Sequence, residues 1–409
     1  MKIFDPRHET LGPEELEQLQ LERLQALISR LRRNVPRYRK SLGSVRVPTP
    51  ADLSNVPPTS PEDLGAAFPY GMFALPLREV MRLYSTIGPG GMQLVVGHTR
   101  NDLAHWGRLA ARQLVAAGGT EHDVIQIGFG GGASGQALGF MLGAEQIEAS
   151  VIPQDAYRPE YQLAMMQSYR ASILITTPTQ AQELAAILDR RGIDPQSLQL
   201  RSVLLTRPVP DTVREELKTG LFSQVHCSFG VGEVLDPGLC VECEEGRFHV
   251  NEDEFVVEIV NGELLVTTLL REAMPLLRYR TRIQCDMERV RCPCGRTGAV
   301  LRPLGRLDGR LRVNEMPLYR NQIEALLAQT RAKGHPFLLD ISEREVRISI
   351  MVTAELFPDT VRMMQGLKTE IESAFLEQLG VRAAVEYLGP RDYEQREKND
   401  QSKAFPGGW

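Results

Sequence analysis

Apolar residues recur along the chain with two different spacings, and these spacings predict its elements. Between residues 13 and 33 apolar side chains return every three or four positions with charged residues between them, which predicts an amphipathic helix. From residue 99 to residue 219 short apolar runs such as VIQIG and SILIT alternate with helical patterns. Runs that are apolar on both faces are typical of buried parallel strands joined by crossover helices.

The alternating part of the chain predicts an α/β domain on a mainly parallel sheet. Thr99 is expected to cap the first of its helices, with Asp102 as the reciprocal partner. The expected helices cover residues 99–117, 136–145, 160–170, 179–191 and 211–219, and the expected strands cover residues 124–128, 150–153, 171–176 and 202–206.

The pattern changes to short strands and turns after Cys240. The runs FVVEIV and ELLVTTL are predicted to pair as a hairpin across Asn261–Gly262. From residue 304 onward two helical and three strand patterns predict a small α+β domain, and its polar tail is expected to be mobile in part. We therefore expect a large N-terminal domain over residues 1–303, its β-rich part over about 236–303, and a small C-terminal domain over residues 304–409.

Composition and charge narrow the classes of partner. The net charge of −5 over 409 residues gives no reason to expect nucleic acid or an anionic membrane. No apolar run approaches the roughly 20 residues that span a bilayer, and the first residues lack the apolar core of a signal peptide. We expect a cytoplasmic protein with reduced cysteines. Cys227 and Cys285 are expected to be packed core thiols.

A glycine-rich stretch, YSTIGPGGMQLVVGHT at residues 84–99, is the first candidate site. Its Gly88, Gly90 and Gly91 lie directly before an apolar strand pattern. A glycine-rich turn beside a strand presents backbone N–H groups to a phosphate. Yet Met92 stands where a phosphate loop places positive charge, and the stretch contains no lysine. A plain turn and an anion site both remain open.

The spacing of the other four cysteines gives the strongest chemical signal. Cys240, Cys243 and His249 form one group, and Cys292 and Cys294 form a second about 50 residues later. Thiolates and imidazole in a set of four suit tetrahedral zinc, and a closed set of protein ligands indicates a structural ion. We expect Cys243, His249, Cys292 and Cys294 to be the ligands, with Cys240 as the alternative member. The competing interpretation is a set of reduced buried cysteines and a surface histidine.

Two further groups of charged residues are candidates for phosphate chemistry. Glu233 follows Phe229–Gly232, where a carboxylate either holds magnesium or caps a helix N-terminus. Arg278, Arg280 and Arg282 alternate along a predicted strand, which places their guanidinium groups on one face. That face either clamps a phosphate or carboxylate or forms solvated salt bridges.

Together these segments resemble the phenylacetate–CoA ligase family, a branch of the AMP-forming acyl-activating enzymes. The resemblance covers nearly the whole chain and is carried by VVGHTRNDLAHW, GEVLDPG, ELLVTTLLREAMPLLRYRTR and GRLDGRLRV, while CPCGRTG and the upstream EC…H are similar to the zinc-bearing members. It implies an enzyme that makes an acyl-adenylate from a carboxylic acid, ATP and Mg²⁺, rotates its small domain and transfers the acyl group to CoA. It also implies a homodimer.

The resemblance assigns roles to particular residues. Glu233 matches the magnesium carboxylate, Arg280 the phosphate-side arginine and Asp308 the hinge between domains. The catalytic lysine of the tail has only Lys403 or Lys398 as a counterpart. The positions matched to the nucleotide site are Gly88, Gly90, Gly91, Phe229 and Gly230, and those matched to the acid pocket, within FGGGASGQALGF, are Phe129, Gly130, Ser134 and Gly135.

The chain departs from the family pattern at the nucleotide contacts. The family's phosphate loop, serine-serine-glycine-threonine-threonine-glycine-lysine, is matched by residues 86–92, without the two threonines and the lysine. The glycine-alanine-glutamate-proline element beside the adenine is matched by residues 205–208, LTRP. The ribose aspartate is matched by Ile283, which cannot accept hydrogen bonds. The glycine that lets the pantetheine arm pass is matched by Glu315.

These departures predict a diverged ligase-fold protein in which ATP-dependent acid activation is lost or redirected. Its expected ligand is a small carboxylic acid or acyl group. If the activity is lost, a protein partner is also expected. One alternative is an active AMP-forming ligase for an aryl or acyl carboxylic acid. A second is a transferase that uses a preformed activated acyl group. The first hypothesis expects an intact fold, a filled zinc site and no affinity for ATP.

Overall fold

The chain divides into two units. The computed structural model describes residues 2–43, 45–129, 134–153, 159–313, 316–342, 345–352 and 361–399. One unit comprises Met1–Gly88 with Gln93–Leu304, and the other comprises Pro89–Met92 with Gly305–Trp409. No helix among the described residues is long and apolar enough to cross a membrane.

The four helices at the start of the chain all begin with proline. Proline suits the first helical position because that position needs no N–H donor and takes the φ that the ring imposes. The long amphipathic helix predicted from residue 13 is confirmed as α2, and it buries an apolar stripe that includes Leu24, Leu27 and Leu31. The four helices are α1 (Pro6–Glu9), α2 (Pro13–Asn34), α3 (Pro36–Leu42) and α4 (Pro61–Ala66).

The glycine-rich stretch forms the turn of an antiparallel pair of strands. Strand β1 (Arg82–Ile87), which the sequence analysis did not expect, pairs with β2 (Gln93–His98). Gly90 and Gly91 adopt φ values of 72° and 82° in the turn, a region that glycine enters without steric cost. Helix α5 (Arg100–Ala116) follows, and Thr99 caps it with Asp102 as predicted.

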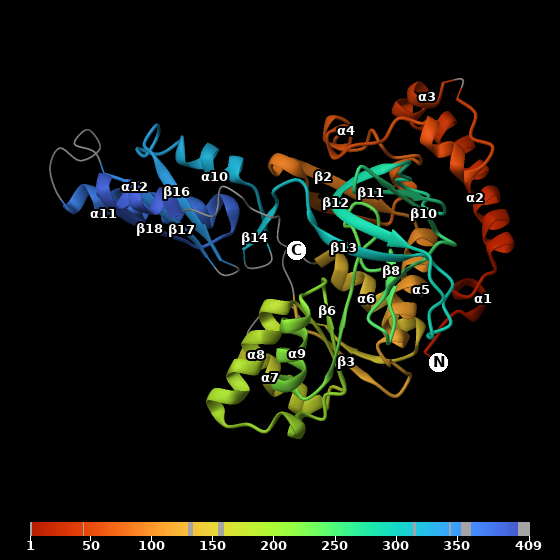
Figure 1. The fold of residues 1–409 in the computed structure, drawn as a ribbon, viewed down its shortest axis with the longest axis horizontal. Coiled ribbons are helices and arrows are strands. Elements are labelled where there is room, and N and C mark those ends of the chain that lie inside the picture. The colour runs from red at the N-terminus through yellow and green to blue at the C-terminus, as the bar shows by residue number, and fades with distance from the viewer. Residues whose placement is uncertain are drawn as a thin grey trace. The chain divides into compact units, whose positions relative to one another are not determined.

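The predicted parallel sheet is confirmed, with one strand more than expected. The strand order is β4-β3-β5-β6-β7, and every neighbouring pair is parallel. Helices α5 and α6 lie on one side of the sheet and α7, α8 and α9 on the other (Figure 1). The elements are β3 (Val124–Ile127), α6 (Ser134–Gln146), β4 (Ser150–Ile152), α7 (Pro159–Tyr169), β5 (Ile173–Thr176), α8 (Pro178–Arg191), β6 (Ser202–Leu205), α9 (Asp211–Leu221) and β7 (Gln224–Cys227).

A six-stranded sheet forms the β-rich part of the same unit, in the order β10-β11-β12-β13-β9-β8. The hairpin predicted across Asn261–Gly262 is present, and both turn residues have positive φ, as a type I′ turn requires. The strands are β8 (Cys240–Glu242), β9 (Phe248–Val250), β10 (Phe255–Val260), β11 (Glu263–Thr268), β12 (Tyr279–Glu288) and β13 (Val300–Arg306).

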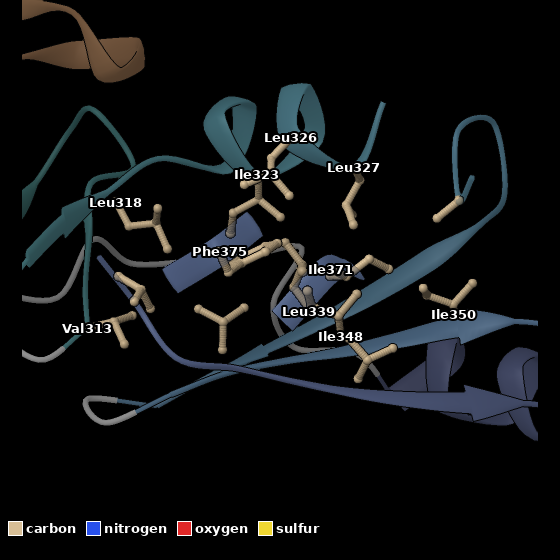
Figure 2. Packing of buried hydrophobic residues seen from close by; sticks show 14 of the residues in the cluster. Val313, Leu318, Ile323, Leu326, Leu327, Leu339, Ile348, Ile350, Ile371 and Phe375 are labelled. Atoms are coloured by element: carbon tan, nitrogen blue, oxygen red, sulfur yellow. The ribbon is translucent and has the colours of Figure 1, made fainter. Parts of the chain in front are cut away.

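The second unit has its own core. Side chains from α10, α11, the helical turn Phe375–Leu379 that follows it and a three-stranded sheet meet in one cluster, with Ile323, Ile371 and Phe375 facing Leu339 and Ile348 (Figure 2). Part of the polar tail, which was expected to be mobile in part, forms a helix, α12. The elements are β14 (Leu311–Val313), β15 (Met316–Leu318), α10 (Arg320–Leu327), β16 (Phe337–Ile341), β17 (Val346–Met351), α11 (Val361–Ala374), β18 (Ala383–Leu388) and α12 (Pro390–Asn399).

Candidate functional site

The segment expected to form the acid pocket follows β3 at the place where the strand order reverses. Strand β4 lies on one side of β3 and β5 on the other, and ligands of open α/β sheets bind beyond the carboxyl ends of strands at such a point. Phe129 itself is buried in the core with Ile127 and Phe140. Gly130 lies outside the described residues, and Ser134 is the first residue of α6.

Gly135 lies against an aromatic ring from the strand before the glycine turn. A Cβ at Gly135 would lie 3.3 Å from Cε2 of Tyr84, so a larger residue here would press on the ring. Tyr84 therefore borders the segment that carries the expected acid pocket. The sequence analysis quoted Tyr84 as the start of the glycine-rich stretch but gave it no role.

Two side chains of β1 contact the turn that carries Glu233. The hydroxyl group of Tyr84 donates to the carbonyl oxygen of Gly232 at 2.8 Å, and the hydroxyl group of Thr86 lies 3.5 Å from Oε1 of Glu233. The structure thus places Glu233, the expected magnesium ligand, next to Thr86, which is the hydroxyl residue that the matched phosphate loop keeps. Gly230 is required by close packing, since a Cβ there would lie 2.7 Å from the carbonyl oxygen of Leu235.

Three more side chains donate hydrogen bonds to the segment from Gly232 to Pro237. Nη1 of Arg271 donates to the carbonyl oxygen of Val234 at 2.8 Å, and Nε1 of Trp106 donates to that of Pro237 at 2.7 Å. Nε2 of Gln136 donates to Oδ1 of Asp236 at 2.9 Å. These donors come from three distant parts of the sequence, so residue spacing alone gives no signal for them.

His98 is stacked between two aromatic rings. Its ring centroid lies 4.7 Å from that of Trp106 and 5.5 Å from that of Tyr84, with interplanar angles of 13° and 24°. Neither ring nitrogen has a hydrogen-bond partner among the described residues. Burial, and then the nearby charge of Arg271, hold the pKa of His98 well below its usual value of 6.5, so the ring is neutral at physiological pH.

The three arginines have separate glutamate partners. Arg280 and Arg282 alternate with the buried residues of β12, and Arg278 lies directly before that strand and is itself buried. The salt-bridge interpretation fits, because each guanidinium group has a carboxylate partner. The pairs are Arg278 with Glu258 at 2.9 Å, Arg280 with Glu263 at 2.6 Å and Arg282 with Glu62 at 3.0 Å.

The four expected metal ligands come together in the β-rich part. The ligand atoms of Cys243, His249, Cys292 and Cys294 all lie within 4.8 Å of one another, and all four residues are buried. The Sγ atoms of Cys243 and Cys292 are 3.8 Å apart, and Sγ of Cys294 lies 3.4 Å from Nε2 of His249. Zn–S bonds of about 2.3 Å in a tetrahedron place two sulfur atoms about 3.8 Å apart, so this donor set fits zinc.

The histidine of this cluster is oriented by a second hydrogen bond. Nδ1 of His249 lies 3.0 Å from the carbonyl oxygen of Gly298, which directs Nε2 toward the cysteines. Cys240, the alternative ligand, lies outside the cluster and is fully buried near Cys285. Cys227 and Cys285 are buried, as predicted for core thiols.

Curated relatives decide the family of the chain, although no protein-family model matches it. It is 33% identical over 399 residues to the phenylacetate–coenzyme A ligase of Thermus thermophilus, which covers 92% of this chain and 86% of the relative. It is 32% identical over 385 residues to that of Escherichia coli K12, which covers 89% and 87%. The chain belongs to the phenylacetate–coenzyme A ligase family.

Solved structures of acyl-CoA ligases share the fold of this ligase-like protein and confirm the predicted fold class. 2-Hydroxyisobutyryl-CoA ligase in complex with 2-HIB-AMP and CoA matches with a TM-score of 0.86 and 19% identity, over 98% of this chain and 96% of that chain. A malonyl-CoA ligase ternary product complex matches with a TM-score of 0.55 and 17% identity, over 75% and 70%.

Other residues assigned from the ligase family fall in several environments. Ile283, at the position of the ribose aspartate, is apolar and 2% exposed. Asp308, the expected hinge residue, is ion-paired with Arg306 at 2.7 Å. Burial opposes its ionisation, but the bonds from Arg306 outweigh burial and hold the pKa of Asp308 below its usual value. Lys403 and Glu315 lie outside the described residues, and Lys398 is in α12.

Proposed function

We propose that this phenylacetate–CoA ligase-like protein has lost or redirected the ATP-dependent activation of its acid. The observation that carries the proposal is the apolar, buried Ile283 at the ribose position, where the family places a carboxylate. Pro89 lacks a backbone N–H for a phosphate, and Met92 lacks the lysine charge. If each lost contact is worth about 1–2 kcal/mol at the transition state, their joint loss lowers the rate by several orders of magnitude.

The acid-binding side of the site supports retention of a small carboxylic acid or acyl ligand. Strand β3 ends at the reversal of the strand order, and Gly135 places no side chain against the ring of Tyr84. Glu233 lies beside Thr86, where it would hold a magnesium ion if a phosphate were bound. In this proposal these residues bind and orient an acyl group without forming an adenylate.

We also propose that Cys243, His249, Cys292 and Cys294 bind a structural zinc ion. The distances between their ligand atoms fit a tetrahedral site, and a set of four protein ligands leaves no open coordination position. The ion would join the turn after β8, strand β9 and the turn before β13. Its contribution is to the folding of the β-rich part and not to a chemical step.

Calorimetric titration with ATP and Mg²⁺ tests the main proposal. We expect no binding heat, and the phenylacetate–CoA ligase of Escherichia coli measured under the same conditions serves as the positive control. Dissociation constants in the micromolar range would refute the loss of nucleotide binding. The amount of zinc bound in the same samples shows whether the protein is folded, because we expect a folded β-rich part to retain the ion.

The alternative, an active AMP-forming ligase, is favoured by the retained Glu233 beside Thr86. It predicts pyrophosphate release when ATP is mixed with the correct aryl or acyl carboxylic acid.

A double substitution, Met92→Lys with Ile283→Asp, restores two missing groups, and Met287→Lys, at an exposed residue of β12, is the matched control. Recovery of ATP binding in the double variant alone would show that these two positions account for the loss.

A further inference from the structure

The N-terminal segment contacts the turn that carries two of the proposed zinc ligands. Oε2 of Glu9 accepts a hydrogen bond from Nε of Arg296 at 2.7 Å, and the two side chains are only 2% and 4% exposed. Arg296 comes two residues after Cys294, within the stretch between β12 and β13. A buried ion pair therefore joins α1 to the metal-binding turn, about 290 residues away in the sequence.

Glu9 also holds the fold of the N-terminal segment itself. Its Oε1 accepts hydrogen bonds from the backbone N–H groups of Phe4 and Asp5, at 3.0 and 2.8 Å. Its carbonyl oxygen accepts from the N–H group of Thr297 at 3.2 Å. One residue thus bonds to both segments through its side chain and its backbone.

Arg296 makes the same connection from the other side. Besides Glu9, it donates from Nη2 to the carbonyl oxygen of Lys2 at 2.7 Å. Separation of the two segments would break the Glu9–Arg296 ion pair and the hydrogen bonds to Lys2 and from Thr297 together. The two segments are therefore expected to order and disorder together.

The metal-binding turn has little regular structure of its own. Residues 289–299 lie between β12 and β13 and form no strand or helix. A backbone hydrogen bond from Gly295 to the carbonyl oxygen of Cys292 closes the turn at 3.0 Å. The position of Cys292 and Cys294 thus depends on what anchors the turn, and Arg296 is the nearest anchored residue with a buried charge.

We propose that Glu9 is a positioning residue for the metal-binding turn, and that zinc binding and docking of residues 2–9 favour each other. The inference rests on the proposed zinc site. By thermodynamic linkage, the factor by which docking strengthens zinc binding equals the factor by which zinc strengthens docking. Loss of zinc releases the N-terminal segment, and loss of the Glu9–Arg296 ion pair weakens the hold on zinc.

Zinc affinity in two matched variants tests the first half of this coupling. Glu9→Gln removes the charge that pairs with Arg296 and keeps the size of the side chain. Arg302→Gln is the control, because it removes the ion pair between Asp286 and an arginine of β13 that is 74% exposed and lies outside the turn. Competition with a chromophoric chelator should give a dissociation constant for zinc 10–100-fold higher in Glu9→Gln, the range for residues that orient metal ligands, and within twofold of the original in Arg302→Gln.

Hydrogen exchange in the unaltered protein tests the second half without any substitution. Removal of zinc by a chelator should increase amide exchange in residues 2–9, including Phe4 and Asp5, and zinc addition should reverse it. Unchanged exchange there, or unchanged zinc affinity in Glu9→Gln, would overturn the coupling and leave the zinc site standing. Failure of the unaltered protein to bind zinc would overturn both proposals.

Discussion

Tyr84 and Gly232 are joined by a hydrogen bond from the tyrosine hydroxyl group to the glycine carbonyl oxygen, with 2.8 Å between the two oxygen atoms. The bond links the strand before the glycine turn to the residue before Glu233. The same ring packs on Gly135 and stacks with His98. One side chain thus touches three segments that the sequence analysis assigned to separate parts of the site.

Substitution of Tyr84 by phenylalanine isolates this hydrogen bond, because the ring and its stacking are kept. We expect the free energy of unfolding to fall by about 0.5–1.5 kcal/mol, the usual net value of one hydrogen bond. Urea denaturation measures the change, and Tyr161→Phe, at a residue that is 55% exposed, serves as the control. Equal stability of Tyr84→Phe and the original chain would mean that the hydroxyl group is equally well satisfied by water.

Local sequence signals predicted the parts of the fold that depend on local chemistry. Asn261 and Gly262 specify the hairpin because both accept positive φ, and Thr99 with Asp102 specifies the start of α5. Strand β1 was missed because its residues, RLYSTI, show no alternation of apolar and polar positions, and none of them is fully buried. It is a strand because it pairs with β2, and the spacing of apolar residues gives no information about that pairing.

The candidate site was predicted only where residue type and spacing indicate it, and not where it depends on contacts between distant residues. Four metal ligands are recognisable from residue type and spacing, and the structure brings those four together without Cys240. Arg271 and Trp106 were missed, because their hydrogen bonds to the Glu233 turn join residues 37 and 131 positions apart. Spacing left an anion clamp and salt bridges open for the three arginines, because their glutamate partners, Glu258, Glu263 and Glu62, lie 17 to 220 positions away in the sequence.

Neutral His98 predicts a loss of stability in mild acid. Its pKa is about 6.5 when unfolded and well below that when folded, so below pH 6.5 the unfolded chain binds a proton that the folded chain does not. The free energy of unfolding therefore decreases as the pH falls from about 6.5 toward the folded pKa. His226, whose pKa burial and then Lys2 lower to about 4, acts in the same direction.

His98→Phe should flatten part of this pH dependence, because the ring stays stacked and no longer titrates. Replacing a buried polar group without partners by an apolar ring of similar shape is also expected to leave stability at pH 7.5 unchanged or slightly higher. Chemical denaturation at several pH values between 4.5 and 7.5 measures both effects. His122→Gln, at an exposed residue, should keep the original slope, and a retained slope in His98→Phe would contradict the assignment.

Removal of the proposed zinc ion should lower the melting temperature of the first unit. Structural zinc sites contribute folding free energy directly, so chelation removes that contribution. Cys294→Ser should lose bound zinc, whereas Cys240→Ser should retain about one equivalent, because Cys240 is buried but lies outside the cluster. Metal analysis of protein purified without added metal gives the stoichiometry. Less than about a tenth of an equivalent in the unaltered protein would show that the ligand set is wrong.

Arg271 is predicted to connect the glycine-turn hairpin with the Glu233 turn. It donates to the carbonyl oxygens of Gly97 and Val234, both at 2.8 Å, and substitution by leucine removes both bonds. Because hydrogen bonds to charged groups are worth about 1.5–3 kcal/mol each, we expect Arg271→Leu to lower the free energy of unfolding by at least about 2 kcal/mol. Arg108→Leu, at a half-exposed residue of α5, is the control and should cost less than about 1 kcal/mol.

The charge of Arg271 gives this variant a second, independent signature. Its positive charge disfavours protonation of His98, so its removal should raise the pKa of His98 toward 6.5. The folded and unfolded pKa values then differ less, and the stability lost between about pH 6.5 and the folded pKa becomes smaller. NMR titration of the His98 ring protons measures the shift. A pKa of His98 that stays equally low in Arg271→Leu would assign the effect to burial alone, and would refute the electrostatic link between the two residues.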